Sequence, residues 1–142
     1  MYVDRLMKSG APARAEEVLS NALSRQWRPA WVALYGILDT GDPAQRLRRA
    51  EKWLGSHGDD RDLLLALGRL SRRCSLWGKA RQYLETCVSG NGSSEALDEL
   101  ALTLEAIGER DEALKYYRRA ANARRDGGGV PAEDRRRRAT SR

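Results

Sequence analysis

Apolar residues recur at helical intervals along most of the chain. Around a short polar break at residues 75–78, they fall three or four positions apart on both sides. The members of this pattern are Leu63, Leu64, Leu67, Leu70 and Cys74 before the break, and Ala80, Tyr83, Leu84, Cys87 and Val88 after it. Such spacing places one apolar stripe along each of two helices. Because the break is so short, the two helices must fold back antiparallel, and the stretch 60–91 predicts a helical hairpin.

Small residues at fixed places identify this hairpin as one unit of a repeat. The tetratricopeptide pattern puts small side chains where the two helices of a unit approach most closely. Ala113 of a second copy lies 33 residues after Ala80, near the usual repeat length of about 34. The signature positions of the two copies are Leu67, Gly68, Ala80, Leu84, Cys87, Gly108, Ala113, Tyr117 and Ala120. Two copies in register predict an all-α tetratricopeptide-repeat solenoid, an α-α superhelix whose hairpins bury each other's apolar stripes.

The same periodicity divides residues 1–125 into about 3.5 helical hairpins. The predicted helix pairs cover about residues 2–26, 29–56, 60–90 and 93–125, and the first helix, 2–9, is short. The residues expected to cap helices at their starts are Asp42, Ser93 or Ser94, and Asp111. In the helix that opens at Pro29, the expected buried face is Trp31, Leu34, Tyr35 and Leu38. Residues 126–142, rich in glycine and arginine, predict a disordered basic tail.

The net charge of +6 is concentrated at the C-terminal end. Residues 1–117 carry 17 basic and 17 acidic groups, whereas residues 118–142 carry nine arginines and three acids. Four of these arginines form the run 135–138. Such a run can attract nucleic acid or anionic lipid, and because no aromatic residues are interleaved with it, weak attraction to lipid is the better interpretation.

The sequence offers little support for catalysis or for a bound metal. Its one histidine, His57, is expected on the surface in a turn, and no CxxC, HExxH, GxSxG or phosphate-loop pattern occurs. The acids Asp59, Asp60 and Asp62 crowd a helix start, where capping and the helix dipole account for them without a metal. We therefore expect a non-enzymatic protein without a cofactor.

The two cysteines are expected to be free core thiols. In the predicted hairpin, Cys74 lies near the turn, while Cys87 is separated from it by helix of roughly 15 Å. This is too far for a disulfide and indicates a reducing compartment. No stretch approaches the length of about 18 apolar residues that a membrane span requires, and the N-terminus lacks the apolar core of a signal peptide.

Three further segments are informative: LALGRLSRRCSLWGKARQYLE at 65–85, the preceding RAEKWLGSHGDD, and the later LDELALTLEAIGERDEALKYYRRA. They resemble the C-terminal repeat region of the HemY family of bacterial proteins. The resemblance covers about residues 11–125, and LWGKAR is its most specific part. It implies a role in late haem biosynthesis, by holding enzymes of the pathway or by passing on porphyrin, and it supplies no catalytic residues. It also implies a bacterial inner-membrane protein whose N-terminal anchor is absent here, so that this fragment is expected to be soluble and on the cytoplasmic side.

The concave side of a tetratricopeptide array is lined by the first helix of each pair, and residues not used in packing point into it. The expected partner-binding groove comprises Asp62, Leu65, Arg69, Arg72, Arg73, Asp98, Leu102 and Glu105, together with Glu95 and, upstream, Val32, Gly36 and Asp39. One interpretation is a solvated, salt-bridged surface. The other is a groove whose arginines clasp carboxylates of a partner, with Leu65 and Leu102 as apolar anchors. The lysine and asparagine set with which chaperone-binding repeats hold a C-terminal carboxylate is missing.

These observations favour a protein-protein interaction scaffold whose partners are haem-biosynthesis enzymes. One alternative is a porphyrin or haem carrier that uses His57, Cys74 or Cys87, and another is nucleic-acid binding through the basic tail. Trp77, at the hairpin turn, is expected to pack on the neighbouring hairpin. A homo-oligomer through the exposed face of the N-terminal repeat is left open.

Overall fold

The computed structural model describes residues 12–38, 41–90 and 92–127. Within these ranges the regular structure is helical, and no strand occurs. The helices are α2 (Pro12–Arg25), α3 (Pro29–Ile37), α4 (Pro43–Lys52), α5 (Leu54–His57), α6 (Arg61–Arg73), α7 (Trp77–Val88), α8 (Ser94–Ala106) and α9 (Arg110–Gly127). The helix predicted over 2–9, the groove residue Asp39 and the arginine run 135–138 lie outside the described residues.

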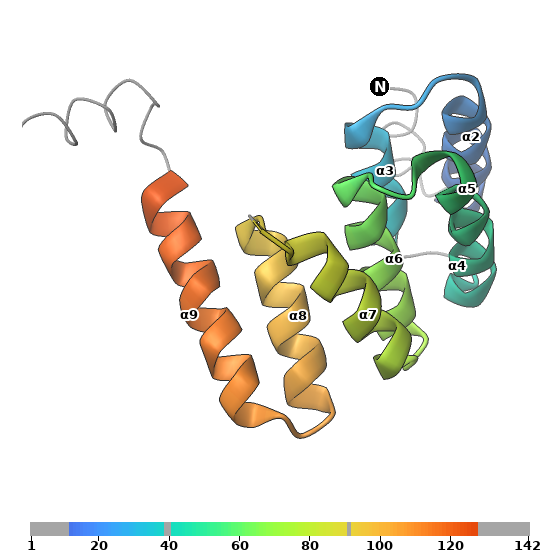
Figure 1. The fold of residues 1–142 in the computed structure, drawn as a ribbon. Coiled ribbons are helices and arrows are strands. Elements are labelled where there is room, and N and C mark those ends of the chain that lie inside the picture. The colour runs from blue at the N-terminus through green and yellow to red at the C-terminus, as the bar shows by residue number, and fades with distance from the viewer. Residues whose placement is uncertain (1–11, 39–40, 91, 128–142) are drawn as a thin grey trace, which may run out of the picture.

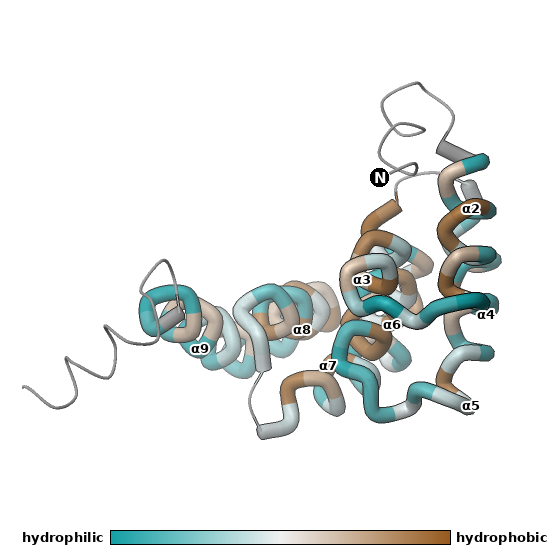
Figure 2. Tube along the Cα trace, turned by 90° about the horizontal axis from the view of Figure 1, so that it is seen from above, coloured by the Kyte–Doolittle hydropathy of each residue, from teal (hydrophilic) through white to brown (hydrophobic). Residues whose placement is uncertain are grey.

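The helices stack as successive antiparallel pairs (Figure 1). The first helices of the pairs are α3, α6 and α8, and the second helices are α4 with α5, α7 and α9. Helix α6 holds the stack together because it packs against α3, α4 and α7, while α8 packs on α7 and α9. Seen from above, α2 and α4 lie at one end and α9 at the other (Figure 2). The arrangement is the predicted solenoid of helical hairpins.

Two apolar clusters form the core, and α6 contributes to both. Leu63, Leu67 and Leu70 are fully buried in the cluster shared with α2, α3 and α4. Leu64 and Leu65, on another side of the same helix, pack with residues of α7, α8 and α9. A helix that is apolar on two sides needs neighbours on both, so α6 takes the central place in the stack.

The small residues of the repeat signature lie at close helix contacts. Ala80 and Ala120 are fully buried, and Ala113 is 2% exposed. A Cβ atom added at Gly68 would lie 2.5 Å from Cγ of Leu84, so only glycine lets α6 and α7 approach this closely. Gly108 has a φ of +87° in the turn between α8 and α9, a conformation that favours glycine. Small side chains at these positions let neighbouring helices approach closely.

The buried face of α3 differs from the prediction by a rotation of the helix. Val32 and Tyr35 are fully buried and Gly36 is buried, whereas Trp31 and Leu34 are only partly covered. The expectation that Val32 and Gly36 point into the groove was wrong. Gly36 lies against α6, where an added Cβ would come within 2.8 Å of the Cα of Ala66. One position of sequence turns a helix by about 100°, so a one-residue error in phase exchanged the groove face for the packing face.

Helix starts follow the predicted caps in most places. The side chain of Asp42 accepts a hydrogen bond from the Ala44 amide at 3.0 Å, and Ser93 accepts one from Ala96 at 3.2 Å. Ser93, and not Ser94, is thus the cap of α8. The expected cap Asp111 was wrong, because α9 already begins at Arg110 and Asp111 lies in its first turn. The predicted second helix of the pair 29–56 is interrupted at Trp53, which separates α4 from α5.

Candidate functional site

The first helices α3, α6 and α8 together border an open hollow of about 390 Å³. Its lining is Ala30, Ala33, Leu34 and Ile37 from α3, Asp62, Leu65 and Arg69 from α6, and Glu95 from α8. We call this surface the first-helix groove. It involves the first helices of the pairs, as predicted for the concave side, but none of the residues on its α3 side was predicted to line a groove, and Leu34 was expected on the buried face.

The α3 side of the groove is apolar. Ile37 is 49% exposed, and Leu34 is partly covered. Figure 2 shows α3 largely in hydrophobic colours, in contrast with the mostly hydrophilic α9. Helix α3 is apolar all round, so that burying Val32 and Tyr35 against its neighbours leaves further apolar side chains facing water. The signal for this face was present in the sequence, since Gly36 precedes Gly68 by 32 residues and aligns Ile37 with Arg69.

The centre of the groove is acidic. Asp62 and Glu95 lie in the first turns of α6 and α8, 33 residues apart, and both line the hollow. The pKa of Asp62 is raised by partial burial and by the nearby carboxylates of Asp60 and Glu95. A second hollow of about 340 Å³ continues past the same pair of acids. Its lining is Arg61, Asp62, Leu65, Cys87, Gly92, Ser93 and Glu95.

The predicted arginines do not point freely into the groove, because each has an acceptor within the stack. Nε of Arg69 lies 3.2 Å from one carboxylate oxygen of Glu99, and Nε of Arg72 lies 2.9 Å from the other. The Glu99 side chain is 14% exposed, so this pair of ion pairs bridges α6 and α8 in a largely covered place. Arg73 donates hydrogen bonds to the carbonyl oxygens of Leu38 and Ile37, at the C-terminal end of α3. The arginines that were expected to clasp carboxylates of a partner are thus held by acceptors within the stack.

Of the groove residues predicted on α8, Asp98 and Glu105 make contacts with α9, whereas Leu102 is exposed. Asp98 pairs with Arg124 of α9, and Glu105 accepts a hydrogen bond from the Tyr117 hydroxyl at 2.6 Å. Burial and the neighbouring carboxylate of Glu105 raise the pKa of Tyr117 to about 12. Leu102 is 42% exposed, and it occupies on α8 the repeat position that Arg69 occupies on α6. Leu65 is only 7% exposed and forms part of the groove floor.

His57 was expected on the surface in a turn, but it is the last residue of α5 and is partly covered. Its ring stacks on Trp27 with centroids 3.8 Å apart and an angle of 4° between the planes. The Trp27 indole also donates a hydrogen bond to the carboxylate of Asp60, which caps α6 through the amides of Asp62 and Leu63. Trp27 was not singled out from the sequence, because it falls between helices and outside every apolar stripe.

The cysteines are free thiols, as predicted. Cys87 is buried and donates from Sγ to the carbonyl oxygen of Arg61 at 3.4 Å, while Cys74 belongs to the other apolar cluster. Burial raises the pKa of both thiols. Within the described ranges, no group of three or more His, Cys, Asp or Glu side chains is arranged to hold a metal ion. Trp77 is partly covered at the start of α7.

Comparison with known proteins agrees with this fold. The family profile described as "Tetratricopeptide repeat" matches residues 96–131. The solved structure described as "Crystal structure of MamA" is similar with a TM-score of 0.68, at 20% sequence identity, over 90% of this chain and 77% of that chain. None of the curated proteins matches the sequence significantly. The chain therefore has the fold of a tetratricopeptide helical solenoid, a class of domain that mediates protein-protein interactions.

These comparisons match no catalytic family. In the part of the chain that the structure describes, no helix is both long enough and apolar enough to cross a bilayer.

Proposed function

We propose that the chain is a non-enzymatic scaffold that holds a segment of a partner protein in the first-helix groove. The observation that carries the proposal is the apolar hollow on this face, with Ile37 half exposed at its edge. Exposed apolar surface beside a hollow is typical of interaction sites, because a soluble protein otherwise covers such surface.

The shape of the groove supports a linear segment as the occupant. Its two hollows share Asp62, Leu65 and Glu95 and are therefore adjacent. A linear segment places side chains at regular intervals and can fill both hollows at once. The aligned position of Leu102 on α8 supplies a further apolar contact along the same face.

The finer part of the proposal concerns the partner. The segments that resemble the HemY family support enzymes of late haem biosynthesis as the proteins held in the groove. The same resemblance supports association with the bacterial inner membrane.

Photo-crosslinking in cells tests the scaffold directly. A photoreactive residue replaces Ile37 in one variant and Leu76 in another, because both side chains are nearly half exposed but Leu76 lies at the turn between α6 and α7. We expect discrete crosslinked proteins from position 37 and none in common with position 76. Mass spectrometry then identifies the crosslinked proteins.

The two parts of the proposal have separate outcomes. Identical crosslinks from both positions, or none from position 37, would refute binding in the groove. Discrete partners from position 37 that include no enzyme of haem synthesis would leave the scaffold in place and remove the haem pathway from it.

A further inference from the structure

The first-helix groove contains two carboxylates that the fold does not neutralise. Among the described residues, neither Asp62 nor Glu95 takes part in an ion pair or accepts a side-chain hydrogen bond. They come from neighbouring first helices at equivalent repeat positions, and both border both hollows. Two acids therefore meet at the middle of an otherwise partly apolar groove.

Nearby cations are directed elsewhere. Arg69 lines the first hollow, but its Nε is held 3.2 Å from Glu99. Arg61 borders the second hollow, and its Nη2 donates to the carbonyl oxygen of Ser89 at 3.4 Å. Asp60, the remaining acid close by, receives two amide hydrogen bonds at the start of α6. The carboxylates of Asp62 and Glu95 are consequently the charged groups at the centre of the groove that no ion pair among the described residues takes up.

The position of Asp62 makes its negative charge costly. Partial burial, Asp60 and Glu95 together raise its pKa, so the ionised form is disfavoured in the folded chain. The dipole at the start of a helix favours an acid in the first turn, and it accounts for the residue type at positions 62 and 95. The helix dipole does not explain why Asp62 and Glu95 line the same hollow beside exposed apolar side chains.

We infer that the groove recognises a linear segment in which an apolar side chain stands close to a lysine or arginine. The apolar side chain packs between Leu34, Ile37 and Leu65. The cation lies between the carboxylates of Asp62 and Glu95, which it neutralises. This inference rests on the proposed function and names the chemistry of the partner that the same groove holds.

Charge complementarity argues for this occupant over an acidic or purely apolar one. An acidic segment would add a third negative charge to a partly buried pair, and like charges in such a place repel strongly. A purely apolar segment would cover the two carboxylates without offering a partner, which costs free energy for each desolvated charge. A cation beside an apolar side chain satisfies both parts of the groove.

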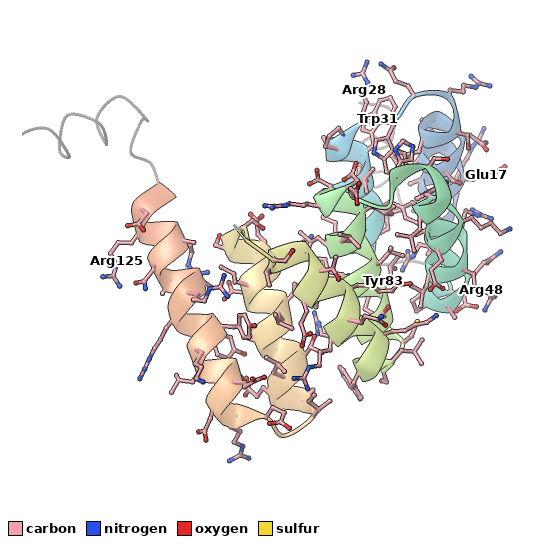
Figure 3. The ribbon with its side chains drawn as sticks, viewed as in Figure 1. Glu17, Arg28, Trp31, Arg48, Tyr83 and Arg125 are labelled. Carbon is pink, nitrogen blue, oxygen red and sulfur yellow. The ribbon has the colours of Figure 1, made fainter. Side chains whose placement is uncertain are left out.

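The test selects short random peptides displayed on phage against the full chain. The selected peptides are then titrated against Asp62→Asn/Glu95→Gln. The control is Glu17→Gln/Glu109→Gln, which removes the same amount of charge at two exposed positions. Glu17 points outward from α2, away from the first helices (Figure 3). A third variant, Ile37→Asp, places a charge on the apolar side of the groove. Circular dichroism checks that each variant is folded.

We expect the enriched peptides to carry a lysine or arginine within two or three residues of an apolar residue. Their affinity should fall about tenfold or more in the variant at 62 and 95 and remain unchanged in the control. Replacement of the peptide's own cation by glutamine should give a similar loss, and the two losses should not add, because both remove the same contact.

Other results would distinguish binding in the groove from the preference of the groove for a cation. Enriched peptides that lose binding to Ile37→Asp but bind the 62 and 95 variant normally would keep the groove and overturn its preference for a cation. Acidic consensus peptides would overturn it as well. Failure to enrich any peptide that distinguishes Ile37→Asp from the unchanged chain would overturn both this inference and the proposed function.

Discussion

Replacement of Gly68 by alanine tests the closest helix contact in the structure. Gly68 lies in the middle of α6, where its missing side chain makes room for Leu84 of α7. The added Cβ would lie 2.5 Å from both Cγ and Cδ2 of Leu84 and 3.1 Å from its Cδ1. Leu84 is fully buried and cannot simply rotate away. The substitution must therefore push α6 and α7 apart or force Leu84 into an unfavourable rotamer.

The expected change in the free energy of unfolding is the difference of two effects. Alanine in place of glycine in a helix interior stabilises by about 1 kcal/mol. Overpacking of a filled core costs about 1–3 kcal/mol, and contacts more than 1 Å inside the normal separation of about 3.5–4.0 Å belong to the upper part of that range. The net expectation is a destabilisation of about 1–2 kcal/mol.

Gly78 provides a matched control on the partner helix. It lies in the first turn of α7, and nothing comes within 4 Å of a Cβ added there. Gly78→Ala should therefore stabilise the chain, by up to about 1 kcal/mol. Urea unfolding followed by circular dichroism measures both variants. Equal stability of the two variants, or a more stable Gly68→Ala, would refute the close approach of α6 and α7 on which the repeat assignment depends.

Three further substitutions test contacts between helices and the acidic centre of the groove. Glu99→Gln should destabilise the chain by about 1–3 kcal/mol, because one of the two guanidinium groups then faces an amide NH2 instead of an acceptor and both lose the negative charge in a covered place. For comparison, Glu112→Gln at an exposed ion pair should cost less than about 0.5 kcal/mol in the same urea titration. Asp62→Asn should raise the thermal midpoint at neutral pH, because the raised pKa means that the ionised carboxylate destabilises the folded state. This gain should disappear below the ordinary pKa of an aspartate, where the carboxyl is protonated in both states, and a gain that persists there would show that its cause is not electrostatic. Trp27→Phe should cost about 1 kcal/mol, because it removes the hydrogen bond to Asp60 while keeping a ring to stack, and a chemical unfolding curve unchanged from the parent would contradict that role.

The fold was predictable because its repeat depends on local spacing. The packing of a helix pair can be predicted from a short segment alone. Its signals here are the apolar stripe through Leu63, Leu67 and Leu70 and the small residue Ala80, all of which are buried. The caps Asp42 and Ser93 are equally local, since each accepts from an amide two or three residues away. Features of this kind can be predicted from the sequence because the residues that form them are close together both along the chain and in space.

The phase of α3 was not predictable in the same way. Helix α3 has apolar residues on every side, so its stripe does not distinguish the face toward α6 from the face toward the groove. The deciding contact is between Gly36 and Ala66, which are 30 residues apart. Counting 32 residues back from Gly68 locates this contact, whereas applying the 33-residue spacing of the later repeats misses it by one position. A groove residue such as Ile37 is therefore visible only after the glycines are aligned.

The charge in the groove depends on Glu99, which belongs to neither the apolar stripe of α6 nor that of α8. Glu99 occupies on α8 the repeat position held by the buried Ala66 on α6, 33 residues earlier. Its carboxylate holds Nε of both Arg69 and Arg72, so both guanidinium groups are anchored at the interface between α6 and α8, although one carboxylate offsets only one of their two charges. With a small apolar residue at position 99, both arginines would be free to face an occupant and the groove would carry both signs. When the charges of each helix are considered separately, the arginines of α6 predict a clasp for carboxylates. When the ion pairs between α6 and α8 are included, Asp62 and Glu95 remain as the groove acids without an ion-pair partner among the described residues.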